Sequence, residues 1–347
     1  SLCYKKLNMS KKNSNVILKK TFKKEIVFNR IYQNLKKELL GFNTRKFVVA
    51  ISGGPDSLAL AATSKALSLE TDLQFYYVLV NHNIRKNSAI EAFEVKKLLK
   101  EFQIILNILH NKKKIGKNIQ SKARQIRYDL LANFCIKKRA KIILTAHNLE
   151  DQVETFFIRL SRGSGLTGLS AMKTVSLLNK NIKLVRPLLD IKKDSLVKIS
   201  KKIFGRYFSD PSNVDNKYLR TKVRNLKKPL LKSGINYDQI IKSIKNLSSS
   251  KDILDKYVKK IIRELLIITK DNVKINFKKF SKLNNEIKIK ILNEAIRKIK
   301  NNYYDPRSKK VINLIHNLSR KDFKKATLAG CLFFIKKDQI CVKKEQI

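Results

Sequence analysis

The sequence predicts an α/β fold: a doubly wound parallel sheet of about five strands, followed by a mainly helical basic region with a small C-terminal β element. Two patterns predict it. From about residue 46 to 190, short apolar runs alternate with longer stretches of helical periodicity, which is typical of parallel sheets with crossover helices. After Pro187 the chain changes to basic amphipathic helices, with lysine and asparagine between the apolar positions.

The individual elements follow from these runs in chain order. We expect strands at 46–51, 75–80, 104–109, 141–146 and 182–186. We expect helices between them at 56–68, 88–102, 119–138 and 149–161, and later helices at 192–204, 237–270, 284–300 and 306–319. Two short apolar runs predict a small hairpin within 326–342. Ligands of such sheets bind beyond the carboxyl ends of the strands, so the segments that follow the strands form the candidate site.

The most informative segment is the turn between the first strand and the first helix, which reads Ser52-Gly53-Gly54-Pro55-Asp56-Ser57. Adjacent glycines let the backbone approach an anion, and the first turn of a helix offers unpaired N–H groups and a positive dipole end. The serines add hydroxyl donors, and Asp56 adds a carboxylate for Mg²⁺. An ordinary turn explains Gly-Gly with Asp and Ser equally well in isolation. The strand before it and the helix after it favour a phosphate site, although the lysine of the Walker loop is absent.

Three further clusters follow strands or open helices. His82 lies in a loop after the second strand, where a structural role is the commoner alternative. Arg124 and Arg127 are three residues apart on one helix face and suit phosphate or carboxylate, unless they belong to a solvated basic face. His147, Asp151 and Glu154 open the helix after the fourth strand, and helical spacing places all three to one side. Acids at a helix start also cap helices, but beside a phosphate loop they predict Mg²⁺ binding or proton transfer.

Two later segments combine glycine, acids and arginines. Residues 159–169 form a basic, glycine-spaced loop that suits a lid or an RNA-facing surface. Residues 210–216 are rich in turn formers and lead into Arg220 and Arg224. We expect the acids of this turn to suit an ammonium group and its arginines to suit a phosphate backbone.

The charge of the chain limits its partners. Lys and Arg number 77 against 27 Asp and Glu, which gives a formal net charge of +50. This excess favours polyanions, with nucleic acid ahead of a membrane surface. An AT-rich genome would enrich Lys, Asn and Ile, but it would also favour Glu, and acids are scarce here.

Hydropathy and cysteine spacing exclude several classes of protein. The sequence holds no uncharged apolar run of about 18 residues, so we expect no membrane span. Its four cysteines, Cys3, Cys135, Cys331 and Cys341, have no CxxC spacing, which argues against a zinc ribbon or a redox pair. A reduced, cytoplasmic compartment fits this usage best.

Taken in order, these segments resemble the tRNA(Ile)-lysidine synthase family of PP-loop ATP pyrophosphatases. The matching strings are SGGPDS at 52–57, VNHNIR at 80–85, ARQIRY at 123–128, TAHNLEDQVET at 145–155, RLSRGSGLTGL at 159–169, RPLL at 186–189 and DPSNVDNKYLRTKVRN at 210–225. TLAGC at 327–331 is similar to the family's C-terminal part. The resemblance is strongest over roughly 45–230, and the co-linear set is far more specific than one loop.

The resemblance implies a reaction and its partners. The O2 atom of the wobble cytidine of a CAU-anticodon tRNA(Ile) attacks the α-phosphate of ATP, and pyrophosphate leaves. The ε-amine of free L-lysine then displaces AMP at C2 and leaves lysidine. ATP and Mg²⁺ are the implied cofactors, and a homodimer is left open. The implied regions are 1–44 as a basic extension with a first helix, 45–230 as the ATP-binding catalytic domain, and 231–347 as a helical tRNA-binding and substrate-binding region.

The resemblance also assigns roles to residues. ATP binding falls to Ser52, Gly53, Gly54, Pro55, Asp56, Ser57 and His82, and the metal to Asp56 and Asp151. The catalytic and lysine-handling group comprises Asp56, Arg124, Arg127, His147 and Asp151. The chain departs from the family pattern at Asn148 and Glu150, for which no essential role is expected, and at Asn81, where no carboxylate role is expected.

Two alternatives remain open. A tRNA thiolase of the same superfamily would need cysteines for persulfide transfer or an iron–sulfur cluster, and the absence of CxxC counts against it. A non-catalytic basic RNA-binding protein explains the charge, but it does not explain Asp56, His147 and Asp151 together.

Overall fold

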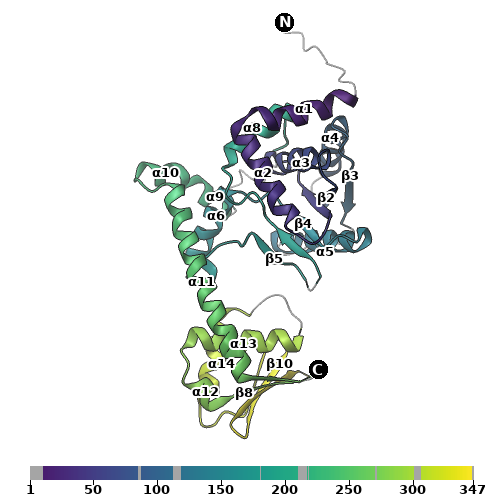
Figure 1. Cartoon of the computed structure of the whole chain (residues 1–347). Helices are drawn as coiled ribbons and strands as arrows, with labels where there is room; N and C mark the ends of the chain where they lie inside the picture. Colours follow the sequence, from purple (N-terminus) through teal and green to yellow (C-terminus); the bar gives the residue numbers. More distant parts are fainter. Residues whose placement is uncertain are drawn as a thin grey trace. The chain divides into compact units, whose positions relative to one another are not determined.

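The computed structural model describes residues 11–84, 87–111, 119–179, 181–209, 217, 219–269, 272–300 and 306–345 (Figure 1). The chain divides into two compact units, Ser1–Lys245 and Asn246–Ile347. No helix of the described residues is long and apolar enough to cross a membrane.

A six-stranded sheet forms the centre of the first unit. Its strands are β1 (Lys46–Ile51), β2 (Gln74–Asn81), β3 (Leu106–His110), β4 (Ile142–Leu144), β5 (Val175–Leu177) and β6 (Lys183–Val185), in the order β3-β2-β1-β4-β6-β5. Every pair of neighbours is parallel except β5 and β6. The predicted parallel sheet is therefore confirmed, with β5 as an added antiparallel edge strand.

Helices cover both faces of this sheet, because alternate residues of each strand point to opposite sides. Phe47 and Val49 of β1 face a core that includes α3 (Pro55–Ser68), α4 (Ser88–Glu101) and α8 (Lys193–Phe204). Val48 faces the other side, where α5 (Ile119–Lys138) packs Leu131 and Cys135. The two helices before the sheet, α1 (Lys11–Lys24) and α2 (Ile26–Leu40), join the first of these cores. The sheet is doubly wound, as predicted.

The remaining helices of the first unit lie around α6 (Leu149–Leu160). They are the short helices α7 (Leu166–Leu169), α9 (Leu219–Asn225) and α10 (Lys227–Lys232). The unit boundary falls within α11 (Tyr237–Leu265), whose first turns pack Ile240 and Ile244 against Val153 of α6.

The second unit is a five-stranded antiparallel sheet with helices packed against it. The strands are β7 (Leu266–Ile268), β8 (Asn272–Asn276), β9 (Lys325–Leu328), β10 (Cys331–Lys336) and β11 (Gln339–Lys344), in the order β7-β8-β11-β10-β9. The helices are α12 (Phe277–Ser281), α13 (Asn285–Lys300) and α14 (Ser308–Leu318). The predicted hairpin is β10 with β11, inside a larger sheet. The prediction of one helix over 237–270 is wrong at its end, because Leu266–Ile268 pairs with β8 as a strand.

Candidate active site

The turn after β1 has a backbone that requires glycine. Gly53 has a φ of +82°, and a Cβ atom built there would lie 2.7 Å from Cγ2 of Val95. The Gly53 carbonyl also accepts a hydrogen bond of 3.0 Å from the backbone N–H of Phe208. Gly54 is the N-cap of α3, with Pro55 in its first turn and no side chain capping the helix, so the first N–H groups of the helix have no partner within it.

The two serines of the turn have different surroundings. Ser57 is buried, and its hydroxyl accepts from the Ser52 N–H at 3.1 Å and donates to the Gly54 carbonyl at 3.0 Å. Ser52 is exposed at the mouth of the turn. Ser57 therefore holds the turn in shape, and Ser52 has the more accessible hydroxyl for a ligand.

Asp56 lies in the first turn of α3 with a carboxylate that is incompletely paired. Its Oδ1 atom is buried and has no hydrogen-bond partner. Burial raises the pKa of Asp56 to about 6; the charge of Lys193 opposes this rise, and the nearby carboxylate of Asp151 adds to it. A buried carboxylate with a free oxygen beside a second acid suits a divalent cation. The described residues contain no group of three acids, histidines or cysteines for a metal, so phosphate oxygens would have to complete its coordination.

The start of α6 forms the opposite wall. Asn148 is its N-cap: its side chain accepts from the Asp151 N–H at 3.0 Å, and the Asp151 carboxylate accepts from the Asn148 N–H at 3.1 Å. This capping box fixes the position of Asp151. Next to it, the Thr145 hydroxyl lies 2.9 Å from Nδ1 of His147. Burial, with the charges of Arg186 and other arginines, lowers the pKa of His147 to about 3, so the ring is neutral at pH 7.

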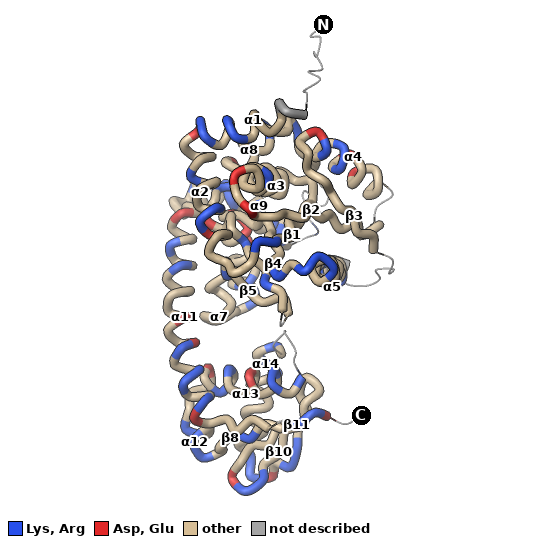
Figure 2. Tube along the Cα trace, turned by 45° about the vertical axis from the view of Figure 1, so that its right-hand side comes forward, with Lys and Arg blue, Asp and Glu red and all other residues tan. Residues whose placement is uncertain are grey.

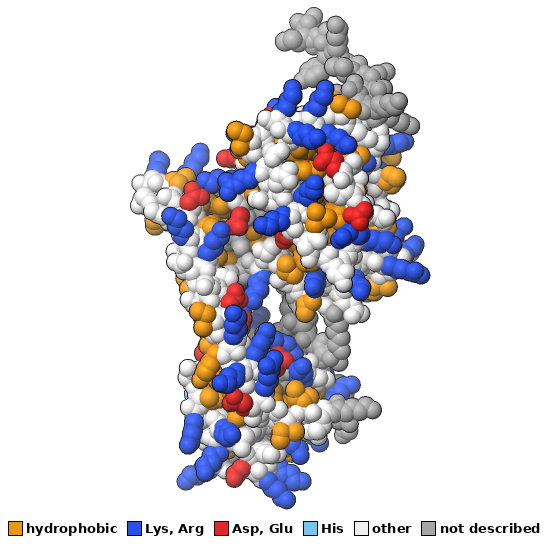
Figure 3. Space-filling model, in the orientation of Figure 1, with side chains coloured by type: hydrophobic (Ala, Val, Ile, Leu, Met, Phe, Trp, Pro, Cys, Tyr) orange, Lys and Arg blue, Asp and Glu red, His pale blue; other side chains and the backbone are white. Residues whose placement is uncertain are grey.

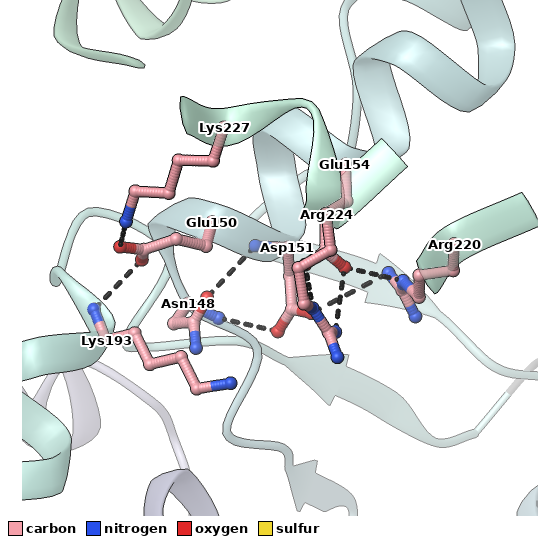
Figure 4. Close-up of polar contacts among 8 residues, drawn as sticks. All are labelled: Asn148, Glu150, Asp151, Glu154, Lys193, Arg220, Arg224 and Lys227. Carbon is pink, nitrogen blue, oxygen red and sulfur yellow. Dashed lines mark hydrogen bonds and ion pairs between the residues drawn. The ribbon is translucent and has the colours of Figure 1, made fainter. Parts of the chain in front are cut away.

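Two ion-pair groups tie α6 to α8, α9 and α10 (Figure 4). Glu154 is 3% exposed and accepts from Arg224 at 2.8 and 3.2 Å. Arg220 lies 2.9 Å from Glu154 and 3.7 Å from Asp151. Arg224 is therefore neutralised within the chain, where the sequence suggested a phosphate contact.

Glu150 makes the second group. Its Oε2 atom accepts from the backbone N–H of Lys193 at 2.9 Å, and Oε1 lies 3.4 Å from the ammonium of Lys227. The start of α8 is thereby fixed against α6, while the side chain of Lys193 lines the cavity described next and points away from Glu150 (Figure 4). Asn148 and Glu150, for which no essential role was expected, both position neighbouring groups.

These elements enclose a cavity of about 650 Å³ at the carboxyl ends of β1, β2 and β4. Nine of the predicted site residues line it: Ser52, Gly54, Pro55, Asp56, Ser57, His82, Arg127, His147 and Asp151. Gly53 does not line the cavity, but its positive φ sets the shape of the turn that does. Arg124 does not line the cavity; it is exposed, with its guanidinium 5.0 Å from the centre of the Tyr128 ring.

His82, predicted to bind the nucleotide, lines the cavity directly after β2. Neither ring nitrogen has a hydrogen-bond partner, and burial, with the charge of Arg127, lowers the pKa of His82 to about 4. A neutral ring with free nitrogens suits a neutral polar group of a ligand.

Several cavity residues were missed by sequence reasoning. Lys193, Tyr207 and Phe208 line it from α8 and the segment after α8. Only Lys193 carried a signal, since it opens a helix soon after a strand of the parallel sheet. The turn at 210–216, predicted to contact a substrate, lies outside the described residues. In the loop 159–169, Arg159 donates to the carbonyls of Gly168 and Ala171 at 2.7 and 2.8 Å, so it holds the loop together.

Comparisons with known proteins point to one family. A family model described as the PP-loop domain matches residues 23–231. The chain is 33% identical over 306 residues to the tRNA(Ile)-lysidine synthase of Wolbachia pipientis wMel, an alignment that covers 87% of this chain and 70% of that protein. It is 29% identical over 335 residues to the tRNA(Ile)-lysidine synthase of Clostridioides difficile (strain 630), covering 93% and 71%.

A solved structure supports the fold. The U34-tRNA thiolase NcsA from Methanococcus maripaludis matches with a TM-score of 0.55 and 20% identity, covering 65% of this chain and 80% of that one. At this identity the match concerns the fold alone, and it carries nothing about the reaction.

Proposed function

Because the chain belongs to the tRNA(Ile)-lysidine synthase family, we propose that it is a ligase that joins L-lysine to C2 of the wobble cytidine in a CAU-anticodon tRNA(Ile). The PP-loop domain implies that the enzyme uses ATP. The observation that carries the proposal is the cavity in which the glycine turn faces two acids, Asp56 and Asp151. The basic residues beyond about 231 are proposed to bind the tRNA.

In the first step the cytidine O2 attacks the α-phosphate of ATP, the bond to the β-phosphate breaks, and pyrophosphate leaves. The turn at Ser52–Gly54 and the N–H groups at the start of α3 are placed to bind the departing phosphates. Lys193 supplies the positive charge that a Walker loop obtains from its own lysine. Asp56 and Asp151 would hold Mg²⁺, which neutralises phosphate charge when bound.

In the second step the ε-amine of lysine attacks C2, and the bond from C2 to the adenylate oxygen breaks. The amine must lose a proton to a group of the cavity. His147 is a weak base, because its pKa lies near 3, so we assign the proton to a carboxylate of the cavity and a hydrogen-bonding role to the neutral His147 ring. Of the two arginines, Arg127 is the one we assign to this group, because it lines the cavity.

The thiolase alternative is less well supported. Among the described residues, the cysteines Cys135, Cys331 and Cys341 are all buried. Burial raises the pKa of Cys135 to about 12 and raises the pKa of Cys331, which disfavours the thiolate that sulfur transfer needs.

A labelling experiment tests the proposal. Purified protein is given ATP, Mg²⁺, a CAU-anticodon tRNA(Ile) transcript and radiolabelled lysine, and label in the tRNA is measured with AMP release. We expect label only when ATP and lysine are both present. Asp56→Ala should abolish labelling while tRNA binding stays within about twofold, since the phosphate contacts of the tRNA lie elsewhere. Asp72→Asn, which alters an exposed pair with Arg45, is the control. Wild-type protein that binds tRNA but never incorporates lysine would refute the proposal.

A further inference from the structure

The sheet of the second unit has one face covered by helices and one face that is not. Val273, Ile275, Phe333 and Val342 pack into a core with residues of α13 and α14. Figures 1 and 2 show these two helices on one side of β8, β10 and β11. Side chains alternate along a strand. The residues directly before and after these four in β8, β10 and β11 therefore point to the opposite face of the sheet.

The strand register brings those residues together. Lys274 of β8 pairs with Cys341 of β11, and Cys341 pairs in turn with Phe334 of β10. Lys343 and Lys336 lie two residues further along β11 and β10, on the same face. We call Lys274, Phe334, Lys336 and Lys343 the uncovered face. Its three lysines are exposed and Phe334 is half-buried.

The uncovered face is hollowed around Phe334. A hollow of about 420 Å³ is lined by Asn272, Lys274, Phe334, Lys336, Lys337, Gln339, Cys341 and Lys343. Four of these described residues are lysines and none is acidic. The Lys343 ammonium lies 5.6 Å from the centre of the Phe334 ring. Positive charge therefore lies over an aromatic ring inside one concave surface.

This combination fits single-stranded nucleic acid better than a simple anion. Lysines attract phosphates wherever they occur, but a phosphate alone makes no use of an accessible aromatic ring. An open antiparallel sheet with an aromatic side chain among basic residues is a surface on which an unpaired base stacks while its backbone meets the lysines.

We propose that the uncovered face binds an unpaired segment of the RNA substrate, with Phe334 stacked on a base and Lys274, Lys336 and Lys343 contacting phosphates. This inference rests on the proposed function for the identity of the RNA. It adds a contact surface on the second unit that is separate from the cavity at the carboxyl ends of the first unit's sheet.

The test compares tRNA binding by full-length variants at fixed salt. Phe334→Leu keeps an apolar side chain but removes the ring, and we expect about tenfold weaker binding because one stacked base is lost. Phe334→Tyr keeps the ring and should bind as the wild type does. Lys274→Gln with Lys343→Gln should lower the slope of log K against log salt by about 1 to 2. Thermal unfolding checks that each variant is folded.

A matched control removes two charges from the other side of the same sheet. Lys309 and Lys310 are exposed on α14, and their replacement by glutamine changes net charge equally. If this pair weakens binding as much as the Lys274 and Lys343 pair, or if Phe334→Leu binds as the wild type does, the proposal is overturned. A change in mass by sedimentation without a change in RNA affinity would assign the face to a second copy of the chain and would also overturn it.

The failure of this inference is distinguishable from failure of the proposed function. Binding is measured without lysine or ATP, so a Phe334-dependent affinity stands even if no lysine is incorporated. The opposite result is also possible. If every variant incorporates lysine and binds tRNA as the wild type does, the proposed ligase activity stands and the proposed RNA-binding role of the uncovered face is rejected.

Discussion

At the scale of single residues, the cavity is built from side chains whose roles depend on small differences of position. Ser52 and Ser57 belong to one turn, yet the Ser57 hydroxyl is hydrogen-bonded to the backbone of the turn. It accepts from the Ser52 N–H at 3.1 Å and donates to the Gly54 carbonyl at 3.0 Å. Gly53 contributes no side chain, but its positive φ and the 2.7 Å approach to Val95 leave no room for one. The turn thus presents backbone and one accessible hydroxyl to a ligand.

Lys193 is the cation that we expect to stabilise the departing phosphates. Lys193→Met keeps the length of the side chain and removes its charge, and the backbone N–H that binds Glu150 is unchanged. We expect turnover to fall about tenfold to a hundredfold, because loss of a charged hydrogen-bond donor costs about 1.5–3 kcal/mol. Lysine incorporation and AMP release measure the effect, while tRNA affinity should not change.

The neighbouring lysine is the control for this prediction. Lys192 is exposed and pairs with Asp238 at 2.9 Å on the surface. Lys192→Met should therefore leave turnover close to the wild-type value, as exposed pairs contribute little. Equal losses in the two variants would show that Lys193 has no special place in the reaction.

The sequence could identify the types of residue in the site, but it could not choose between equivalent candidates. Arg124 and Arg127 lie on one face of a predicted helix, and both suited phosphate. Only Arg127 lines the cavity, because the packing of Tyr128 and Leu131 on the sheet fixes how α5 is rotated. Such rotation depends on tertiary contacts that no local pattern contains.

At the scale of elements, strong local periodicity was sufficient for prediction. The helices α3, α4, α5 and α6 begin and end within about a residue of their expected bounds, because apolar periodicity and turn residues define them. The strands β5, β7, β8 and β9 were missed. Each has three to five residues, too few for a period to be visible, and each pairs with a neighbouring strand that supplies its hydrogen bonds.

Asp255 links two helices of the second unit and predicts a pH dependence of its stability. Its carboxylate contacts Lys251 at 2.6 Å and Lys290 of α13 at 2.5 Å. Burial alone would raise the pKa of Asp255, but the hydrogen bonds from the two lysines lower it below its ordinary value. A lowered folded-state pKa means that the contribution is present above the unfolded pKa of 3.8 and disappears as the pH falls through the folded value.

Asp255→Asn should therefore destabilise the second unit at pH 7 by about 1.5 to 3 kcal/mol, the range for hydrogen bonds to charged groups. The difference from the wild type should shrink in strongly acidic solution, where both side chains are neutral. Thermal unfolding of the two proteins from pH 7 down to pH 3 measures this. Asp322→Asn breaks a fully exposed pair with Arg320 and should have a much smaller effect at any pH. If the stability difference between Asp255→Asn and the wild type grows as the pH falls, the stabilising role assigned to the Asp255 carboxylate is wrong.

At the scale of the whole molecule, basic residues occur on both units. Figure 3 shows lysine and arginine across the visible face of each, with acids few and scattered. The sequence predicted the excess charge, but the boundary between the units was not visible in it. That boundary lies inside α11, where the helical pattern runs on without a break and only the packing partners change.

A net charge of +50 predicts that tRNA binding is driven largely by the release of counterions from the RNA. Affinity for the tRNA should fall about a thousandfold or more between 50 and 200 mM salt if some six or more phosphates are neutralised. ATP binding should fall much less, because a single turn and a few side chains hold a small ligand in a partly enclosed cavity. Titration of tRNA and of ATP over the same salt series, with one protein preparation, gives the salt dependence of each affinity for comparison. Parallel slopes for tRNA and ATP would show that the charge spread over the two units does not contribute to RNA binding, and the assignment of the basic surface to the tRNA would then have to be abandoned.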